Sequence, residues 1–213
     1  MNVMTPVVHL VDNDPRVLKA LARLLEAEGL CTTSSTSAQQ FLSLYDPNVP
    51  GCVVLDLVMP GTSGLDLQAQ LERDQRRIPL VFLSGCSDVP DSVRAMKGGA
   101  IDFLTKPVDA DALLLAVRGA IAHDLAQRAQ ADKDRDVRAA LQTLTPREHE
   151  ILPFLVSGRL NKQIAGELGV VEKTVKVHRM HVMEKLGLHS VADLVRLAER
   201  QHILPAPVGR TPN

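Results

Sequence analysis

Short apolar runs alternate with amphipathic stretches through the first half of the chain. Four runs rich in Val, Leu, Ile or Phe have the length of buried strands in a parallel sheet, and a weaker one lies near residues 31–33. The four span residues 7–11, 53–56, 80–83 and 101–104. Stretches with helical spacing follow, starting near Pro15, Ser37, Gly64, Asp91 and Asp109. This order predicts an α/β fold with a doubly wound, five-stranded parallel sheet.

Residues that favour helix starts support this division. Pro15 suits the first turn of a helix, and Asp14 before it is a good cap. Ser37 and Gln40 have the spacing of a capping box.

The second half of the chain carries four predicted helices and no predicted strand. The first begins with a Thr145 cap, Pro146 at the first position and Glu148 at the third. The others span residues 161–168, 172–186 and 191–201. The two helices around Gly169 predict a helix-turn-helix.

The segment between the halves, residues 120–141, is rich in Ala, Gln, Asp and Arg and has no glycine or proline. Such residues favour helix. We expect an extension of the preceding helix, a polar stretch and a short helix leading into the second half. A dimeric coiled coil stays open here, although no sustained heptads support it.

These patterns divide the chain into an α/β domain at 1–122, a helical linker at 123–140, an all-α domain at 141–204 and a disordered tail at 205–213. The tail is assigned from its proline content.

Charge differs between the two halves. Residues 1–122 have a net charge of −4, and residues 141–213 have a net charge of +3. This asymmetry suggests different partners and permits binding of nucleic acid by the second half. No apolar run approaches the length of a membrane span, and the three cysteines lack metal-ligand spacing, so we expect a cytoplasmic protein with reduced thiols and no membrane partner.

Polar residues cluster where the predicted strands end. The carboxyl ends of parallel strands share one edge of a sheet, so these side chains can converge. They are Asp12, Asn13, Asp56, Ser84 and Lys106. Two acids at one site favour a cation between them, and oxygen ligands suit Mg²⁺. A lysine and a hydroxyl nearby would hold phosphoryl oxygens, so the pattern predicts phosphoryl transfer to Asp56.

Residues 5–122 resemble the receiver domain of two-component response regulators, which has a flavodoxin-like fold. The resemblance rests on Val11-Asp12, Asp14, Asp56 with Met59-Pro60-Gly61, Ser84 and Phe103-Leu104-Thr105-Lys106-Pro107. It implies that Asp56 accepts phosphate from a histidine kinase and that Lys106 contacts the phosphoryl group. It further implies a Mg²⁺ site at Asp12, Asp56 and the Val58 carbonyl, switch roles for Ser84 and Phe103, and a cis peptide bond before Pro107.

Three positions modify that expectation. Asn13 stands where the family usually has a second acid, which would weaken Mg²⁺ binding unless Asp14 compensates. Val58 and Cys86 occupy positions that influence water access in this family, and neither suits the orientation of a water. We therefore expect slow loss of the phosphate from Asp56.

The predicted helix at residues 172–186 has two distinct faces. Val175, Val182 and Leu186 form an inner stripe, with His178 and Arg179 at its edges. The outer face carries Lys173, Val177, Met180 and Glu184, flanked by Lys176 and His181. Cations beside apolar contacts are typical of major-groove readers. We interpret His178 as a packed residue, and the scattered histidines imply no zinc site.

Residues 141–204 resemble the LuxR-type helix-turn-helix of the NarL/FixJ group. The resemblance rests on Leu144-Thr145-Pro146-Arg147-Glu148, Asn161-Lys162-Gln163-Ile164-Ala165, Leu168-Gly169-Val170, Lys173-Thr174-Val175-Lys176-Val177-His178 and Lys185-Leu186-Gly187-Leu188. It implies that Lys176, Val177 and Met180 lie nearest the bases, and that Lys162, Lys173, Thr174 and Arg179 hold or flank phosphates. The last helix would form a dimer contact through Val191, Leu194 and Val195.

Two residues depart from the pattern of this second family. Val171 replaces the usual Ser or Thr cap, at a cost of about 1 kcal/mol. Met180 replaces a polar reader, so the base preference cannot be transferred.

Together these features predict a transcription factor whose DNA binding is switched by phosphorylation. Because members of this family are usually activators, the resemblance implies an activator. Its partners would be a histidine kinase, double-stranded promoter DNA, a second copy of the chain on activation and RNA polymerase. An alternative is a DNA-binding regulator that works without phosphorylation, which Asn13 supports. A phosphohydrolase is disfavoured because Val58 stands two residues after Asp56, where such an enzyme needs a general acid.

Overall fold

The computed structural model describes residues 4–85 and 89–207. The chain forms two compact units, Met1–Ala129 and Gln130–Asn213. None of the helices in the described ranges is long and apolar enough to cross a membrane.

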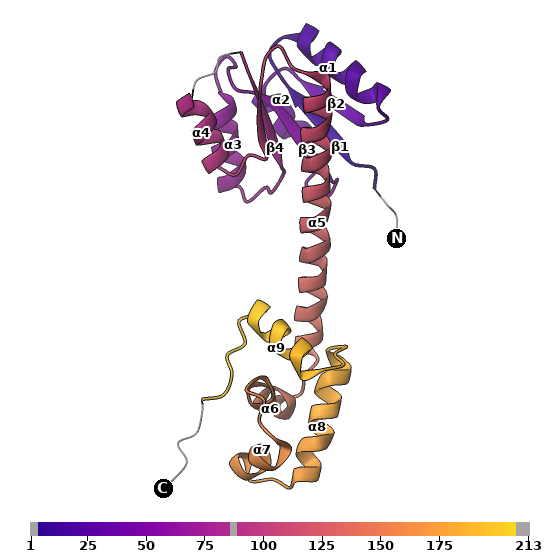
Figure 1. Cartoon of the computed structure of the whole chain (residues 1–213), viewed down its shortest axis with the longest axis vertical. Coiled ribbons are helices and arrows are strands. Elements are labelled where there is room, and N and C mark those ends of the chain that lie inside the picture. Colours follow the sequence, from indigo (N-terminus) through magenta and orange to yellow (C-terminus); the bar gives the residue numbers. More distant parts are fainter. Residues whose placement is uncertain (1–3, 86–88, 208–213) are drawn as a thin grey trace. The chain divides into compact units, whose positions relative to one another are not determined.

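The first unit is built on a five-stranded sheet (Figure 1). Its strands are β1 (Val7–Val11), β2 (Cys31–Ser35), β3 (Gly51–Asp56), β4 (Leu80–Ser84) and β5 (Asp102–Thr105). Their order is β2-β1-β3-β4-β5, and every neighbouring pair is parallel. The predicted doubly wound parallel sheet is therefore confirmed.

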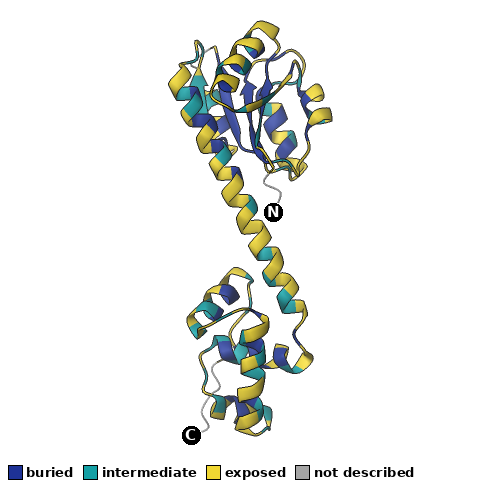
Figure 2. Cartoon of the chain, turned by 90° about the vertical axis from the view of Figure 1, so that its right-hand side faces the viewer, coloured by how far each residue is buried: buried dark blue, intermediate teal, exposed yellow. Residues whose placement is uncertain are grey.

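Helices cover both faces of this sheet. The helices α1 (Pro15–Ala27) and α5 (Ala110–Gln142) pack on one face, around Leu10, Val54 and Val81. The helices α2 (Ala38–Leu44), α3 (Gly64–Arg73) and α4 (Val89–Lys97) pack on the other, around Leu55 and Phe82. Figure 2 shows the strands as the buried centre of the unit. Burial on both faces explains why these strands read as unbroken apolar runs.

Several predicted helix starts are found in the structure. Asp14 caps α1, where its carboxylate accepts the N–H of Arg16. Ser37 caps α2 and accepts the N–H of Gln40, but the Gln40 side chain accepts the Thr36 N–H, so the reciprocal half of the capping box is absent. The helix α4 begins at Val89, two residues before the predicted start.

The helix α5 differs most from expectation. The sequence predicts a polar interruption after its first part, but α5 continues unbroken from Ala110 to Gln142. Its middle is largely exposed (Figure 2) and has contacts between side chains one turn apart, such as Arg135 with Asp132 at 3.1 Å. Polar composition thus marked an exposed helix rather than a break in it.

The second unit contains α6 (Pro146–Val156), α7 (Asn161–Leu168), α8 (Glu172–Lys185) and α9 (Val191–Arg200). Its core includes the fully buried Ile151, Ile164 and Val175. Gly169 ends α7 in the left-handed conformation with φ of 65°, which glycine adopts without steric cost and which turns the chain into α8. The predicted four-helix arrangement with a helix-turn-helix is confirmed.

The start of the tail is ordered, contrary to prediction. Ala206 is buried, and its N–H donates to the carbonyl of Pro153 at 2.9 Å. That carbonyl lies in α6, and Arg159 donates to the Pro207 carbonyl. Residues 208–213 lie outside the described residues.

Candidate functional site

Three charged side chains meet at the carboxyl edge of the sheet. Asp12 follows β1, Asp56 ends β3 and Lys106 follows β5. The Nζ of Lys106 lies 2.7 Å from Asp12 Oδ2 and 2.9 Å from Asp56 Oδ1. The site lies where β1 and β3 are neighbours but not consecutive, which is the topological switch point at which such sheets bind ligands.

Burial sets the electrostatics of these groups. The side chains of Asp12 and Asp56 are 3% and 9% exposed. Burial raises the pKa of Asp56, and the nearby charge of Asp12 adds to this, whereas Lys106 and the Val58 N–H oppose it. Burial lowers the pKa of Lys106, but hydrogen bonds to both carboxylates outweigh it and raise this pKa overall. The lysine is therefore held as a cation between two acids.

The predicted switch residues flank this cluster. Ser84 is fully buried at the end of β4, and its carbonyl accepts the Lys106 N–H at 2.7 Å. Phe103 is half-buried, and its ring stacks on Phe82 with centroids 6.4 Å apart. The peptide bond between Lys106 and Pro107 is cis, as the resemblance implies.

A glycine brings α3 close to the phosphoacceptor candidate. A Cβ on Gly64 would lie 2.5 Å from the Asp56 carbonyl oxygen and 3.0 Å from the Phe82 ring. No side chain larger than hydrogen fits there without a shift of backbone. Gly64 thus lets the first turn of α3 pack directly behind Asp56.

The remaining predicted metal ligands are less enclosed. Asn13 is exposed, and Val58 is 69% exposed. Asp14 accepts the backbone and guanidinium N–H groups of Arg16, which lower its pKa, so its carboxylate is committed to the helix cap rather than to the cluster. Cys86, the other residue predicted to influence water access, lies outside the described residues.

The donor set fits Mg²⁺ chemically. Asp12 and Asp56 offer carboxylate oxygens that face one cation already, and Asn13 and Val58 follow them in the chain with an amide oxygen and a carbonyl. Hard oxygen donors with open positions for water are what Mg²⁺ requires.

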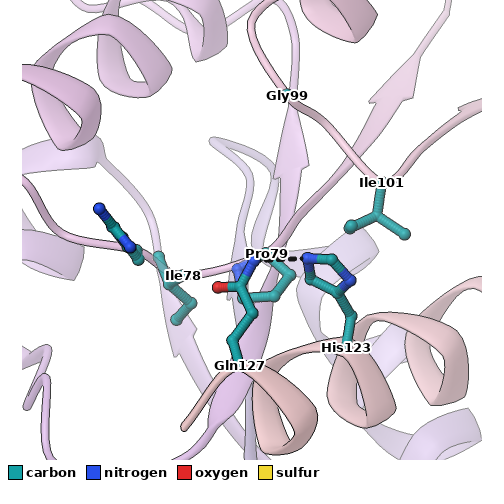
Figure 3. A pocket seen from close by; sticks show the side chains of 7 residues that line it. Ile78, Pro79, Gly99, Ile101, His123 and Gln127 are labelled. Carbon is teal, nitrogen blue, oxygen red and sulfur yellow. Dashed lines mark hydrogen bonds between the residues drawn. The ribbon is translucent and has the colours of Figure 1, made fainter. Parts of the chain in front are cut away.

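A cavity of about 250 Å³ lies elsewhere on the first unit (Figure 3). Its wall includes residues just before β4 and β5 together with His123 and Gln127 of α5, whose side-chain nitrogens are 2.7 Å apart. The lining residues are Arg77, Ile78, Pro79, Gly99, Ile101, His123 and Gln127. This cavity is at the amino edge of the sheet, so it is separate from the Asp56 cluster.

In the second unit, the two faces of α8 separate as predicted. Val175 and Val182 are fully buried, and Leu186 just after the helix is also buried. Lys173 and Lys176 are exposed, as are Val177 at 40% and Met180 at 56%. The structure thus places cations and apolar groups together on the outer face of a helix-turn-helix.

The predicted phosphate-contacting residues lie around that face. Lys162 on α7 is exposed, whereas Thr174 and Arg179 are half-buried. Arg179 reaches Asn161 at 3.4 Å, so it spans from α8 to the start of α7. Val171 is 68% exposed and forms no side-chain cap, which confirms the missing cap at α8.

The predicted dimer contact on α9 needs correction. Leu194 is 1% exposed and belongs to the core of the second unit, so a partner cannot reach it. Val191 and Val195 are half-buried and remain accessible. Helical spacing placed all three residues on one stripe, but it did not distinguish the centre of that stripe from its margins.

Two buried acids were missed by the sequence analysis. Asp124 on α5 is 1% exposed, and its Oδ2 accepts the Gly51 N–H at 2.9 Å and the Arg128 Nε–H at 2.7 Å. Glu148 on α6 is 2% exposed, and its Oε2 lies 2.6 Å from Lys185 Nζ. From the sequence, Glu148 is expected only to cap α6 and Asp124 has no expected role, because charged residues usually lie at the surface.

Comparison with known proteins agrees with both parts of the chain. Residues 8–118 match the model of the response regulator receiver domain, and residues 142–198 match that of the bacterial regulatory proteins of the luxR family. The response regulator protein TodT of Pseudomonas putida is 41% identical over 200 residues, which are 94% of this chain and 88% of that protein. The transcriptional regulatory protein FixJ of Azorhizobium caulinodans is 41% identical over 93% of this chain and 94% of that protein.

Solved structures give the same result. The response regulator StyR has a TM-score of 0.81 and 42% identity, covering 92% of this chain and 99% of that one. Full-length FixJ from B. japonicum has a TM-score of 0.57 and 34% identity, covering 95% of this chain and 100% of that one.

Proposed function

The chain belongs to the family of response regulators that join a receiver domain to a LuxR-type DNA-binding domain, and we propose that phosphorylation of Asp56 controls its binding to promoter DNA. The observation that carries this proposal is the contact of Lys106 with both Asp12 and Asp56 at the carboxyl edge of the sheet. The phosphodonor would be the phosphohistidine of a histidine kinase.

The chemistry follows from the charges of the cluster. An Oδ atom of Asp56 attacks phosphorus, the bond from phosphorus to the donor histidine breaks, and the phosphoryl group remains on Asp56. Lys106 then exchanges part of its contact with Asp56 for the new phosphoryl oxygens. Asp12, Asp56, the Val58 carbonyl and Asn13 would hold Mg²⁺, which would supply positive charge beside those oxygens.

The signal would leave the site through Ser84 and Phe103. Ser84 ends β4, and its carbonyl accepts the Lys106 N–H. A shift of Lys106 would therefore also move the end of β4. Phe103 lies in β5 and packs on Phe82 of β4. Movement of both residues would reshape the surface of α4 and β5 and favour pairing of two receiver domains.

The second unit would then read DNA with α8. Lys176, Val177 and Met180 would face base edges in the major groove, while Lys162, Lys173, Thr174 and Arg179 contact or flank phosphates. Val191 and Val195 would contribute to a homodimer on DNA. A protein that binds promoter DNA in this way would act in the cytoplasm. As an activator it would also contact RNA polymerase. We propose no metabolic reaction for the chain.

Asn13 leaves one alternative, a regulator that binds DNA without phosphorylation. It is less well supported than the phosphorylation switch, because the buried acids and the lysine needed for phosphoryl transfer are all in contact.

DNA binding and molecular mass test the switch directly. We would measure both for wild type and Asp56→Asn, each with and without beryllofluoride and Mg²⁺. We expect beryllofluoride to raise affinity and mass for wild type alone. Equal affinity and mass in all four samples would overturn the proposal.

Substitution of Lys176 tests the assignment of α8. Lys176→Ala should weaken binding, and loss of discrimination between sequences would indicate base contact. A salt dependence shallower by about one in log–log slope would indicate phosphate contact instead. Lys133→Ala, an exposed lysine of α5, is the matched control and should leave the affinity unchanged. Unchanged affinity in Lys176→Ala would contradict the assignment.

A further inference from the structure

Two histidines of α8 lie beside the buried acid of α6. A ring nitrogen of His178, a ring nitrogen of His181 and a carboxylate oxygen of Glu148 all lie within 4.8 Å of one another. His178 and His181 are about 30 residues from Glu148 in the sequence, so their spacing does not indicate a shared site. The packing of α8 on α6 brings the three groups together.

Glu148 is prepared to act as an anionic ligand. Its hydrogen bonds with Lys185 and the Thr145 N–H lower the pKa of Glu148 to about 2. Both of these partners bind Oε2, Lys185 Nζ at 2.6 Å and the Thr145 N–H at 2.8 Å. The other oxygen, Oε1, lies 3.7 Å from His181 Nδ1, beyond hydrogen-bond distance. One oxygen thus fixes the carboxylate, and the second lies toward His181.

His178 has a ring nitrogen whose hydrogen-bonding capacity is unmet. Its Nδ1 is buried and has no hydrogen-bond partner among the described residues. A buried nitrogen without a partner is uncommon and costs free energy, so its presence calls for a physical reason. His178 and His181 are three residues apart on α8, which puts their side chains on adjacent positions of one helix face.

We propose that Glu148, His178 and His181 form a site for a divalent transition-metal ion, with Zn²⁺ the best chemical fit. Two imidazoles and one carboxylate are a common ligand set for Zn²⁺, and water fills the fourth position. Ligands about 2.0–2.2 Å from a tetrahedral ion are about 3.3–3.5 Å apart, so the side chains draw closer by up to about 1.5 Å on binding.

The ion would join α6 to α8, on whose packing the DNA-reading face depends. Lys185 keeps its place on Oε2, so metal binding adds to the existing ion pair rather than replacing it. Metal binding requires unprotonated imidazoles and therefore weakens at acidic pH.

The test uses the full chain with Asp56→Asn in an excess of Mg²⁺, so that the cation site of the receiver is weakened and filled by Mg²⁺. After removal of metal, Zn²⁺ would be titrated by calorimetry, and Co²⁺ by the visible absorption that tetrahedral coordination produces. We expect one equivalent of Zn²⁺ to bind and to raise the melting temperature of the second unit by about 4–8 °C.

Single substitutions identify the ligands. His178→Ala and His181→Ala should each weaken Zn²⁺ binding at least about tenfold and abolish the Co²⁺ spectrum. His189→Ala, an exposed histidine of the same unit, is the control and should behave as the parent chain. Circular dichroism would establish that each variant is folded. Absence of one-equivalent binding by the parent chain, or equal binding by all three variants, would overturn the proposal.

Discussion

The Nζ of Lys106 lies 2.9 Å from Oδ1 of Asp56, at the end of a strand that is buried along its whole length. The lysine opposes the effect of burial on Asp56, but burial prevails and the pKa of Asp56 is raised. Burial therefore makes the charged form of Asp56 unfavourable until a phosphoryl group or a cation compensates for it.

This cost of the buried Asp56 charge predicts that Asp56→Asn stabilises the receiver in the absence of Mg²⁺. Because the pKa of Asp56 is higher in the folded than in the unfolded state, its charge opposes folding once the pH rises through the folded pKa. The gain should be full near pH 7 and should fade as the pH drops toward about 3.9, the pKa of an unfolded aspartate. Urea unfolding followed by fluorescence of Tyr45, the single tyrosine in a chain without tryptophan, reports this unit. A gain independent of pH would contradict the explanation.

Removal of the lysine should have the opposite effect. Lys106→Met leaves two buried carboxylates without their cation, at a cost of about 2–3 kcal/mol in the presence of EDTA. Mg²⁺ should restore part of this loss, because a cation at the acids replaces the lysine's charge. Lys19→Met, on the exposed side of α1, is the control and should change stability by less than about 0.5 kcal/mol. Equal losses with EDTA and with Mg²⁺ would show that the acids do not attract the ion.

Most of the fold could be predicted from apolar periodicity. The strands β1, β3 and β4 of the first unit are buried on both faces, so their sequences are continuous apolar runs that a pattern detects. The weakest prediction, at Cys31, belongs to the edge strand β2, where most side chains are exposed and the apolar signal fades. The continuity of α5 was missed because an exposed helix of polar residues has no apolar stripe to mark it.

The clustering of side chains at the receiver site was predictable because the carboxyl ends of parallel strands lie at one edge of the sheet. The strand order alone is enough to bring together Asp12, Asp56 and Lys106, which are far apart in sequence. The burial of Asp124 and the contacts of Glu148 depend on how each helix is oriented about its axis and packed on its neighbours. The apolar periodicity of the sequence does not specify either. Leu194 shows the same limit, since a helical stripe contains both core and margin residues.

The buried Asp124 predicts that the receiver extends beyond residue 122. Arg128 binds Asp124 and also donates to the carbonyls of Asn48 and Val49, so this part of α5 is fixed to the first unit. Arg128→Met should destabilise the unit by about 2 kcal/mol, because Asp124 keeps only the Gly51 N–H. Tyr45 fluorescence during urea unfolding measures the loss.

Two comparisons make this prediction specific. Arg135→Met removes an exposed pair with Asp132 on the same helix and should cost less than about 0.5 kcal/mol. A fragment ending at residue 122 should be less stable than one ending at residue 129. Equal stability of the two fragments would contradict the extended boundary and favour the boundary expected from sequence.

The ion pair between Glu148 and Lys185 predicts a pH-dependent stability of the DNA-binding domain. The pKa of Glu148 is lowered to about 2, so its charge contributes stability that is present above the unfolded pKa near 4.5 and is lost as the pH falls toward 2. Glu148→Gln retains a residue suited to the capping box but removes the charge, and it should cost about 1–3 kcal/mol at pH 7 in EDTA. Circular dichroism during urea unfolding at several pH values measures this cost, with Glu150→Gln, at an exposed partner of Arg147, as the control. A cost that stays constant from pH 7 down to pH 3 would mean that shape rather than charge explains the contribution of Glu148.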